Sequence, residues 1–125
     1  MDSKVAIITG AAGGLGKAVA HLLADKGHRV MMVDNRRDAL EDLHESLKSN
    51  GADCYCIQAD LIDTGGYASL VSETIARFGG IDILVNAAAI LDRKDIYEVT
   101  PTYFDRVFSV NARAIFFMSR AVLVE

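Results

Sequence analysis

The sequence predicts an α/β fold in which helices cover both faces of a doubly wound parallel sheet. Short apolar segments rich in β-branched residues alternate with segments of helical periodicity along the 125 residues. Polar residues do not alternate with apolar ones in the short segments, which is typical of strands buried on both faces. Because a helix between two such strands is a right-handed crossover, this alternation favours parallel pairing.

The strands are predicted first, from their composition and their boundaries. The segments are Val5–Thr9, Arg29–Asp34, Cys54–Asp60 and Ile83–Asn86. Each is short and apolar and is bounded by polar residues or glycine, as buried strands are.

The helices between these strands are predicted from apolar residues three or four positions apart. The first stripe is Leu15, Ala18, Val19, Leu22 and Leu23, followed by Gly27; the second is Leu40, Leu43 and Leu47, followed by Gly51; the third is Tyr67, Leu70, Val71, Thr74, Ile75 and Phe78, followed by Gly79 and Gly80. Glycine commonly ends a helix because it tolerates the left-handed conformation there. Asp63 or Thr64 is predicted to cap the third helix.

The last helix is predicted to begin with Thr100 as its N-cap and Pro101 at the first helical position, where the missing N–H costs nothing. Asn111 falls on its apolar stripe, which is expected to face inward. The apolar members are Phe104, Val107, Phe108, Ile115, Met118 and Val122. A buried amide without hydrogen-bond partners costs about 1–3 kcal/mol, so one interpretation is that Asn111 ties the helix to a neighbouring loop.

Composition and charge exclude several function classes. The formal net charge is −4 and the longest basic pair is Arg36–Arg37, so a nucleic-acid partner is not expected. No apolar segment approaches the ~20 residues of a membrane span. Cys54 and Cys56 lie on one face of a strand, a poor geometry for a disulfide between them. We expect one cytoplasmic domain over residues 1–125, with reduced thiols and no metal site.

A glycine-rich turn from Thr9 to Gly16 joins the first strand to the first helix and predicts a diphosphate site. Gly10 permits the sharp exit from the strand, Gly14 lets a pyrophosphate approach the backbone, and Gly16 lets the helix pack close to the sheet. The free N–H groups and the positive end of the helix dipole then face the anion. The strand before the turn and the helix after it are the context that a dinucleotide-binding Rossmann fold requires.

The end of the second strand predicts which dinucleotide is bound. Asp34 can accept hydrogen bonds from the hydroxyls of an adenosine ribose and repels a 2′-phosphate, which favours NAD over NADP. Its alternative role is to cap the next helix. Arg36 and Arg37 are close enough in the sequence for one of them to bind a 2′-phosphate.

The pattern T-G-x-x-x-G-x-G, in which Leu15 precedes the last glycine, resembles the signature of the short-chain dehydrogenase/reductase family. Because Gly13 is also present, the form T-G-x-x-G-x-x-G of the epimerase-like branch fits as well. The stretches Phe78–Asn86 and Val110–Arg113 resemble the ordinary branch and favour it. The resemblance implies a partial Rossmann sheet of the first four strands in the order 3-2-1-4.

The resemblance also implies cofactor contacts on the adenosine side. An NADP-preferring arginine in this family usually follows the acidic position directly, and this sequence has Asn35 there, so NAD remains favoured. Asp60 resembles the aspartate whose side chain hydrogen-bonds the adenine amino group, and Leu61 would flank the ring. The residues alone leave a helix-capping role open for Asp60.

On the nicotinamide side, the four residues Asn86, Ala87, Ala88 and Ala89 resemble the family stretch N-N-A-G. The sequence departs from that stretch, because Ala87 replaces the second asparagine and Ala89 replaces the glycine. Asn111 corresponds to the asparagine of V-N-x-x, which in the family joins a catalytic Ser-Tyr-Lys set and holds a water of a proton relay through its main chain.

The function implied by the resemblance is that of an NAD(H)-dependent oxidoreductase acting on a small alcohol or ketone. None of the tyrosines has lysine at the fourth position after it, so the Tyr-x-x-x-Lys motif is absent. We therefore expect this chain to be the front half of the enzyme, truncated on its C-terminal side and inactive by itself. The alternative is a nucleotide-binding module or fragment without catalysis.

A homo-oligomer is also expected, since the last helix is a common subunit interface in the family. The fourth strand would be an unpaired edge in a partial sheet, and the last helix would expose more apolar surface than a complete domain does. The residues expected to be exposed are Phe104, Phe116, Phe117 and Val122. Self-association through this helix follows.

Overall fold

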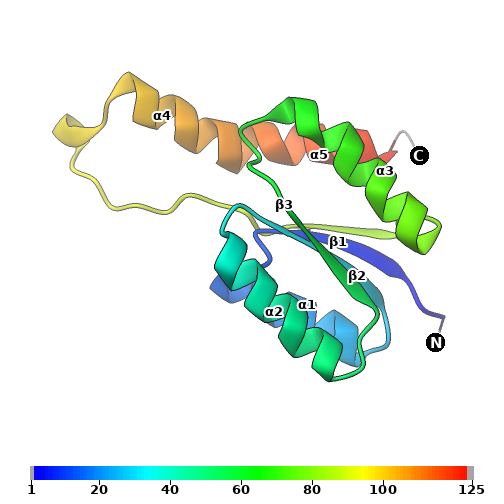
Figure 1. Ribbon diagram of the computed structural model, residues 1–125. Coiled ribbons are helices and arrows are strands. Elements are labelled where there is room, and N and C mark those ends of the chain that lie inside the picture. The colour runs from blue at the N-terminus through cyan, green and yellow to red at the C-terminus, as the bar shows by residue number, and fades with distance from the viewer. Residues whose placement is uncertain (1, 124–125) are drawn as a thin grey trace.

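In the computed structural model, which describes residues 2–123, a parallel sheet carries helices on both faces (Figure 1). The strands are β1 (Val5–Thr9), β2 (Arg29–Asp34), β3 (Cys54–Gln58) and β4 (Ile83–Asn86). They lie in the order β3-β2-β1-β4, and every pairing is parallel. The predicted fold class and strand order are confirmed.

The third strand is shorter than predicted, because it ends at Gln58 rather than at Asp60. Gln58 pairs with Asp34, which is the last residue of β2. The Ala59 N–H still donates to the Asp34 carbonyl at 3.1 Å, but β2 offers no residue beyond it. Asp60 instead begins a turn in which its side chain accepts a hydrogen bond from the Ile62 N–H.

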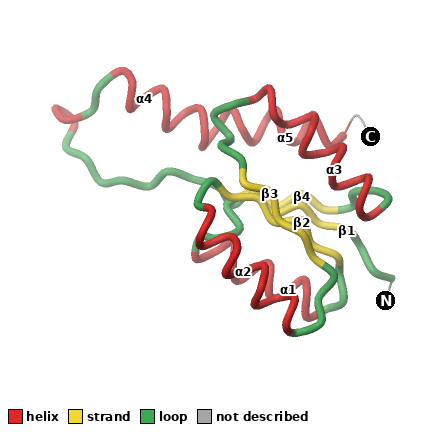
Figure 2. The backbone as a smooth tube through the Cα atoms, viewed as in Figure 1, coloured by secondary structure: helices red, strands yellow, loops and turns green. Residues whose placement is uncertain are grey.

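The helices form one layer on each face of the sheet (Figures 1 and 2). α1 (Gly14–Asp25) and α2 (Arg37–Ser49) cover one face, and α3 (Tyr67–Phe78) and α5 (Ala114–Leu123) cover the other. α4 (Pro101–Phe108) joins α5 through a π-helical turn, Ser109–Arg113, and short 3₁₀ turns lie at Thr64–Gly66 and Ile96–Glu98. α4 and the loop before it extend beyond the sheet (Figure 1).

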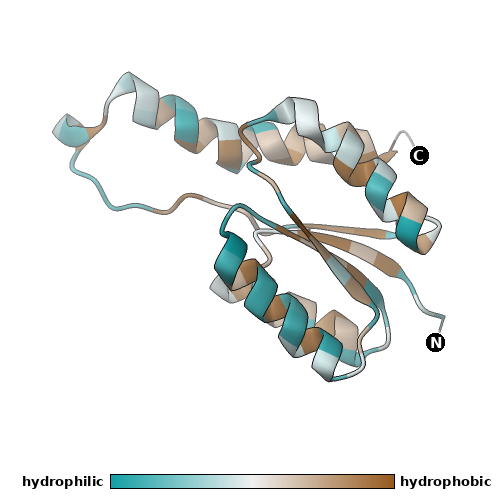
Figure 3. Ribbon diagram, in the orientation of Figure 1, coloured by the Kyte–Doolittle hydropathy of each residue, from teal (hydrophilic) through white to brown (hydrophobic). Residues whose placement is uncertain are grey.

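Each face of the sheet has its own core, because successive strand residues point to opposite sides. Ile7 and Met31 belong to the core beneath α3 and α5, whereas Ile8 and Met32 belong to the core beneath α1 and α2. All of them are completely buried, and burial of such a side chain contributes about 1.5–3 kcal/mol. Figure 3 shows hydrophobic strands between helices, with a hydrophilic outer face on α2.

The apolar stripe predicted for the first helix is only partly buried. The exposed members are Leu15, Ala18 and Leu22. Val19 and Leu23 pack against the core as predicted, but the fully buried positions of α1 are Gly16 and Ala20. These small residues face the sheet and let the helix lie close to it, whereas Leu15 and Leu22 point away from it.

The last helix is not a continuous α-helix, and its predicted inward stripe is partly wrong. The π-helical turn replaces i→i+4 hydrogen bonds with i→i+5 bonds and so shifts the phase of the inward face. The buried residues are Val110, Ala114 and Met118, whereas Phe104, Phe108 and Ile115 are exposed. Of the residues expected to be exposed, Phe104 and Phe116 are exposed, but Phe117 and Val122 pack against the core.

The helix caps follow the sequence with one difference. Asp63 caps the 3₁₀ turn that precedes α3, where its side chain accepts from the Gly65 N–H at 3.0 Å, and Thr64 lies inside this turn. α3 therefore begins later than its predicted cap. Thr100 caps α4 as predicted, by accepting from the Tyr103 N–H at 3.1 Å.

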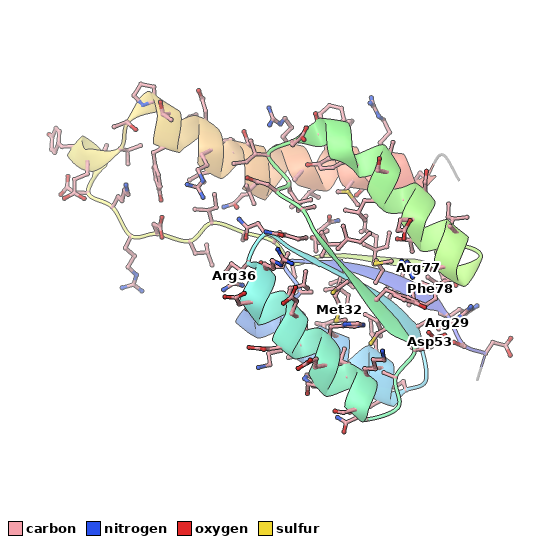
Figure 4. All side chains as sticks on the ribbon, in the orientation of Figure 1. Arg29, Met32, Arg36, Asp53, Arg77 and Phe78 are labelled. Carbon is pink, nitrogen blue, oxygen red and sulfur yellow. The ribbon has the colours of Figure 1, made fainter. Side chains whose placement is uncertain are left out.

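Side chains tie the strands together at the amino end of the sheet. The Asp82 carboxylate accepts a hydrogen bond from the Val5 N–H at 2.9 Å, so the approach to β4 is attached to β1. Arg29, at the start of β2, donates to the carbonyl of Phe78 at 2.9 Å. Figure 4 shows Arg29 and Phe78 at this end and Arg36 at the opposite end.

Cys54 and Cys56 are free thiols that pack in the core beneath α1 and α2. Burial is the main reason that the pKa of each thiol lies above its ordinary value. Within residues 2–123, no group of three or more histidine, cysteine or acidic residues could hold a metal ion. Over the same range, no helix has the length and hydropathy needed to cross a membrane.

Candidate nucleotide-binding site

A pocket of about 240 Å³ opens at the carboxyl end of the sheet. Its wall contains residues that follow each strand: the glycine turn after β1, Asn35 after β2, residues 59–62 after β3 and residues 87–90 after β4. Ligands of doubly wound sheets bind at this end. The volume is below the roughly 300–1,000 Å³ of pockets that enclose a whole small molecule, so the pocket fits one part of an extended ligand.

The glycine turn has the close contacts that its sequence predicts. Gly10 has φ +63°, and an added Cβ would lie 2.5 Å from the backbone nitrogen of Ala88, so only glycine fits. A Cβ on Gly16 would overlap the Gly10 carbonyl oxygen. The first turn of α1 therefore packs directly on the end of β1.

The start of α1 fits an anion. Gly14 is the first helical residue, and nothing lies within 4 Å of an added Cβ there. The N-cap is Gly13, which provides no side-chain hydrogen bond to the first N–H groups. Free N–H groups and the positive end of the helix dipole together attract a phosphate, so these residues fit the diphosphate of a dinucleotide.

Asp34 is buried, and it lines the pocket. One oxygen accepts from the Ala12 N–H at 3.0 Å and the other from the Arg36 N–H at 2.9 Å. The Arg36 guanidinium adds contacts of 3.2 Å and 3.4 Å to the two oxygens. Burial acts to raise the pKa of Asp34, but the hydrogen bonds from Arg36 and Ala12 outweigh it and hold the pKa below its ordinary value. At neutral pH the pocket therefore contains an ionised carboxylate.

The hydrogen bond from the Arg36 N–H concerns the other role that the sequence left open for Asp34, which is to cap the next helix. Arg36 is the N-cap residue of α2, and it makes no side-chain cap bond of its own. Asp34 therefore stabilises the chain entering α2 while it lines the pocket. The contact of Asp34 with the start of α2 is therefore observed, and its contact with an adenosine ribose stays a prediction.

Asp60 and Leu61 line the pocket together with Val110 from the π-helical turn. Leu61 is buried, and its carbonyl accepts a hydrogen bond from the Tyr67 hydroxyl. One oxygen of Asp60 accepts from the Ile62 N–H at 3.1 Å, so this carboxylate also stabilises its own turn. The apolar side chains provide a surface for a flat ring such as adenine.

The end of β4 is held against the start of the glycine turn. The Ala87 N–H donates to the Thr9 carbonyl at 3.2 Å, and the Thr9 hydroxyl donates to the Val85 carbonyl at 3.4 Å. Ala87 and Ala88 line the pocket, whereas Asn86 is half-buried beside it. Thr9 therefore acts behind the pocket, by joining two strand ends.

Asn111 lies in the π-helical turn and is bonded to the loop after β4. Its side-chain amide donates to the Ile90 carbonyl at 2.9 Å, and its side-chain oxygen accepts from the Ile90 N–H at 2.8 Å. Both polar atoms of the side chain are thus satisfied by the backbone of a single loop residue, Ile90. This is the structural role considered for Asn111 from the sequence, and it fixes the loop that continues from the pocket wall.

The pocket divides the predicted residues into two groups. Those that line it are Gly10, Asp34, Asn35, Asp60, Leu61, Ala87 and Ala88. Those outside its wall are Thr9, Gly14, Leu15, Gly16, Asn86 and Asn111. Arg36, which the sequence analysis considered as a ligand for a 2′-phosphate, also lines the pocket. Wall residues that were not among the predicted contacts are Gly13, Val33, Ala59, Ile62, Ala89, Ile90, Arg106 and Val110. Arg106 and Val110 lie four positions apart in the last helical segment. This spacing could have predicted that the two side chains share one face of the helix.

Comparison with known proteins agrees with this geometry. The family model described as short chain dehydrogenase matches residues 4–125. This chain belongs to the short-chain dehydrogenase family. The membership confirms the resemblance inferred from the glycine turn.

Similar proteins are about twice as long as this short-chain dehydrogenase sequence. Versicolorin reductase 1 of Aspergillus parasiticus is 42% identical over 121 residues, which are 96% of this chain and 46% of that protein. A short-chain dehydrogenase/reductase from Burkholderia phymatum in complex with NAD superposes with a TM-score of 0.91 at 28% identity, over 96% of this chain and 43% of the other. A blue fluorescent protein from a metagenomic library in complex with NADPH gives 0.90 at 29% identity, over 99% and 51%. The chain therefore spans about half the length of the relatives that it matches.

Proposed function

We propose that this chain is the cofactor-binding half of an NAD(H)-dependent oxidoreductase that interconverts a small alcohol and a carbonyl compound. The observation that best supports this proposal is the ionised Asp34 carboxylate in the same pocket as the glycine turn. It would accept hydrogen bonds from the adenosine ribose hydroxyls. When bound, a nicotinamide dinucleotide supplies or accepts the hydride.

The residues of this chain would bind and orient the cofactor. The start of α1 at Gly14 would hold the diphosphate, and Asp60 and Leu61 would contact the adenine. Asn111 would keep the loop at Ile90 in place on the nicotinamide side. Because the sequence contains no Tyr-x-x-x-Lys motif, the proton donor would come from outside these 125 residues, and turnover by this chain alone is expected to be negligible.

Titration of the chain with NADH, followed by nucleotide fluorescence, tests the binding. Asp34→Asn keeps the size of the side chain and removes its charge. Hydrogen bonds to a charged group contribute about 1.5–3 kcal/mol, so this variant should bind NADH about tenfold or more weakly. Asp38→Ala, at an exposed acidic position in the first turn of α2, is the matched control and should leave the Kd unchanged. A folded chain that does not bind NADH would refute the proposal.

The second candidate is a nucleotide-binding module without catalysis, for which the pocket beside the glycine turn would serve equally well. The two candidates differ in one measurement. A full-length protein that contains this segment and oxidises NADH in the presence of small ketones is an oxidoreductase. A full-length protein that binds NADH and oxidises none of a broad ketone panel is a binding module.

We also propose that the protein forms a homo-oligomer through α4 and α5. Phe104, Phe108 and Phe116 expose between half and two thirds of their surface, at 52%, 54% and 63%. In the described part of the chain, β4 pairs with β1 and lies at the edge of the sheet. Apolar helix surface and an open strand edge both favour association. Light scattering should show a dimer or a larger species, and a clean monomer would contradict this proposal.

A further inference from the structure

We propose that the open edge of β3 and the groove between β3 and α3 form a docking site for an extended peptide segment with apolar and basic side chains. The segment would add to β3 as a further strand and place an apolar side chain in the groove. The site lies at the outer edge of the sheet and needs no nucleotide.

The edge at β3 differs from the edge at β4. Among the described strands, β3 pairs only with β2 and is the outermost strand on its side. Further strands of a doubly wound sheet add beyond β4, because the usual order is 3-2-1-4-5-6. In a longer sheet of this kind the β4 edge is covered, whereas the β3 edge stays open.

Alternate residues of β3 direct their backbone groups to the open side. In a parallel strand, the N–H and C=O of one residue point to one neighbour, and those of the next residue point the opposite way. The Asp53 carbonyl accepts from the Val30 N–H at 3.2 Å, and the Ala59 N–H donates to the Asp34 carbonyl at 3.1 Å, so the odd-numbered residues face β2. The residues that face outward are Cys54, Cys56 and Gln58.

The two halves of this edge differ in how far the chain itself covers them. A ring nitrogen of His44, on α2, lies 3.2 Å from the Cys54 carbonyl oxygen, so this carbonyl is bonded within the chain. The ring of Tyr55 is covered by the Arg77 guanidinium, whose central carbon lies 3.9 Å from the ring centroid. Within residues 2–123, the outward backbone groups of Cys56 and Gln58 have no such partner. A peptide can therefore pair with the carboxyl half of β3.

A groove of about 540 Å³ lies beside this half of the edge, between β3 and the start of α3. Its large apolar lining residues are Ile57, Leu61, Tyr67 and Leu70. Residues 59–61 also line the nucleotide pocket, but the rest of the groove is formed by the end of β3, the turn before α3 and α3 itself. The volume falls in the range of pockets that bind ligands, so the groove has room for an apolar side chain of a peptide that lies along β3.

The charges around the groove determine the partner. The charged lining residues are Asp60, Asp63 and Glu73, and neither lysine nor arginine is among them. Asp60 and Asp63 each use one oxygen to accept an N–H in their own turn, which leaves the other oxygen for a partner, whereas Glu73 is paired with Arg77 at 2.7 Å. A second copy of this chain would bring the same carboxylates together. Charge complementarity therefore favours a different partner, with lysine or arginine beside its apolar residues.

The first test measures the binding of a fluorescent peptide, with central valines and lysines at its ends, by fluorescence anisotropy. A matched probe is methylated on its backbone nitrogens, which removes the donors for strand pairing and keeps the side chains. The methylated probe should bind about tenfold or more weakly, because the backbone hydrogen bonds to β3 are lost. A probe with glutamate in place of lysine should also bind about tenfold or more weakly, since like charges repel at this rim.

Variants of the chain test the acidic rim. Asp63→Asn should raise the Kd of the lysine probe about two- to fivefold, because asparagine can still cap the turn but has no charge. Asp42→Asn, at an exposed acidic position of α2, is the matched control and should leave this Kd unchanged. The backbone amides of Cys56 and Gln58 should exchange hydrogen rapidly in the chain alone and slowly with the lysine probe bound.

Three results would overturn the docking site. They are equal binding of the methylated and unmethylated probes, equal effects of Asp63→Asn and Asp42→Asn, and no binding of the lysine probe. Slow exchange of both amides in the chain alone would mean that a second copy already covers the edge, which also contradicts the proposal. Titration with NADH remains a separate test of the proposed function.

Discussion

Replacement of Gly16 by alanine tests the contact on which the glycine turn depends. In an ordinary helical position, alanine is about 1 kcal/mol more favourable than glycine. At Gly16 the added Cβ would overlap the Gly10 carbonyl oxygen and lie 2.8 Å from the Gly10 carbonyl carbon and 2.9 Å from the Ala11 Cα. These are backbone atoms, which cannot rotate aside as a side chain can.

The expected magnitude follows from these opposing effects. Overpacking costs about 1–3 kcal/mol, and the upper end applies because the turn must shift as a unit. After the gain in helix propensity of about 1 kcal/mol, the free energy of unfolding should fall by about 2 kcal/mol. For a domain of this size, that loss lowers the melting temperature by about 8 °C.

Urea denaturation followed by circular dichroism measures this loss, and Gly14→Ala is the matched control. Gly14 has open space around an added Cβ, so its alanine variant should be no less stable than the unmodified chain. The same variant should weaken NADH binding, because Gly14 faces the proposed diphosphate position. Equal stability of the Gly16→Ala variant and the unmodified chain would show that α1 does not pack on the turn as described.

Further predictions concern the loop contact, the buried carboxylate and the thiols. Asn111→Ala removes two hydrogen bonds to the loop after β4 and should lower the free energy of unfolding by about 1–3 kcal/mol in urea, whereas Asn50→Ala at an exposed position should have little effect. The folded-state pKa of Asp34 is lowered from 3.8, so its stabilisation is present above that pH and disappears as the pH falls below it; acid titration of stability should be shallower in Asp34→Asn, and identical curves would contradict this assignment. The pKa values of Cys54 and Cys56 are raised from 9.0 by burial, so a thiol reagent at pH 8 should modify the folded chain far more slowly than the chain in urea, and comparable rates would contradict their burial.

The fold was predictable from the sequence because several local signals agree. Buried strands, helix-ending glycines and the turn from Gly10 to Gly16 all indicate the same crossover topology, and each depends on residues close together in the chain. The position of Asp34 in the pocket wall was predictable for the same reason, because the end of the second strand lies next to the glycine turn in this crossover topology.

The remaining features depend on contacts between distant segments. A stripe counted at 3.6 residues per turn placed Phe104 and Phe108 inside, but α4 extends beyond the sheet (Figure 1) and has no buried residue, so these side chains are exposed. Leu15 was placed inside because the small residues of α1, rather than its leucines, determine how closely the helix approaches the sheet. The directions of Arg36 and Arg37 are set by Asp34 and Glu41, and adjacent identical residues carry no signal for that choice.

The two ends of the sheet differ in how much change they can accept. At the amino end of the sheet, the Val5 N–H donates to Asp82 and Arg29 donates to the Phe78 carbonyl, and these bonds help to hold the strands in register. At the carboxyl end, the segment from Ala87 onward follows strands whose register is already held at the other end. Exchanging residues 91–96 for another loop sequence should therefore leave the strand alignment intact. Replacing residues at the amino end of the sheet would remove the bonds that hold the strands in register.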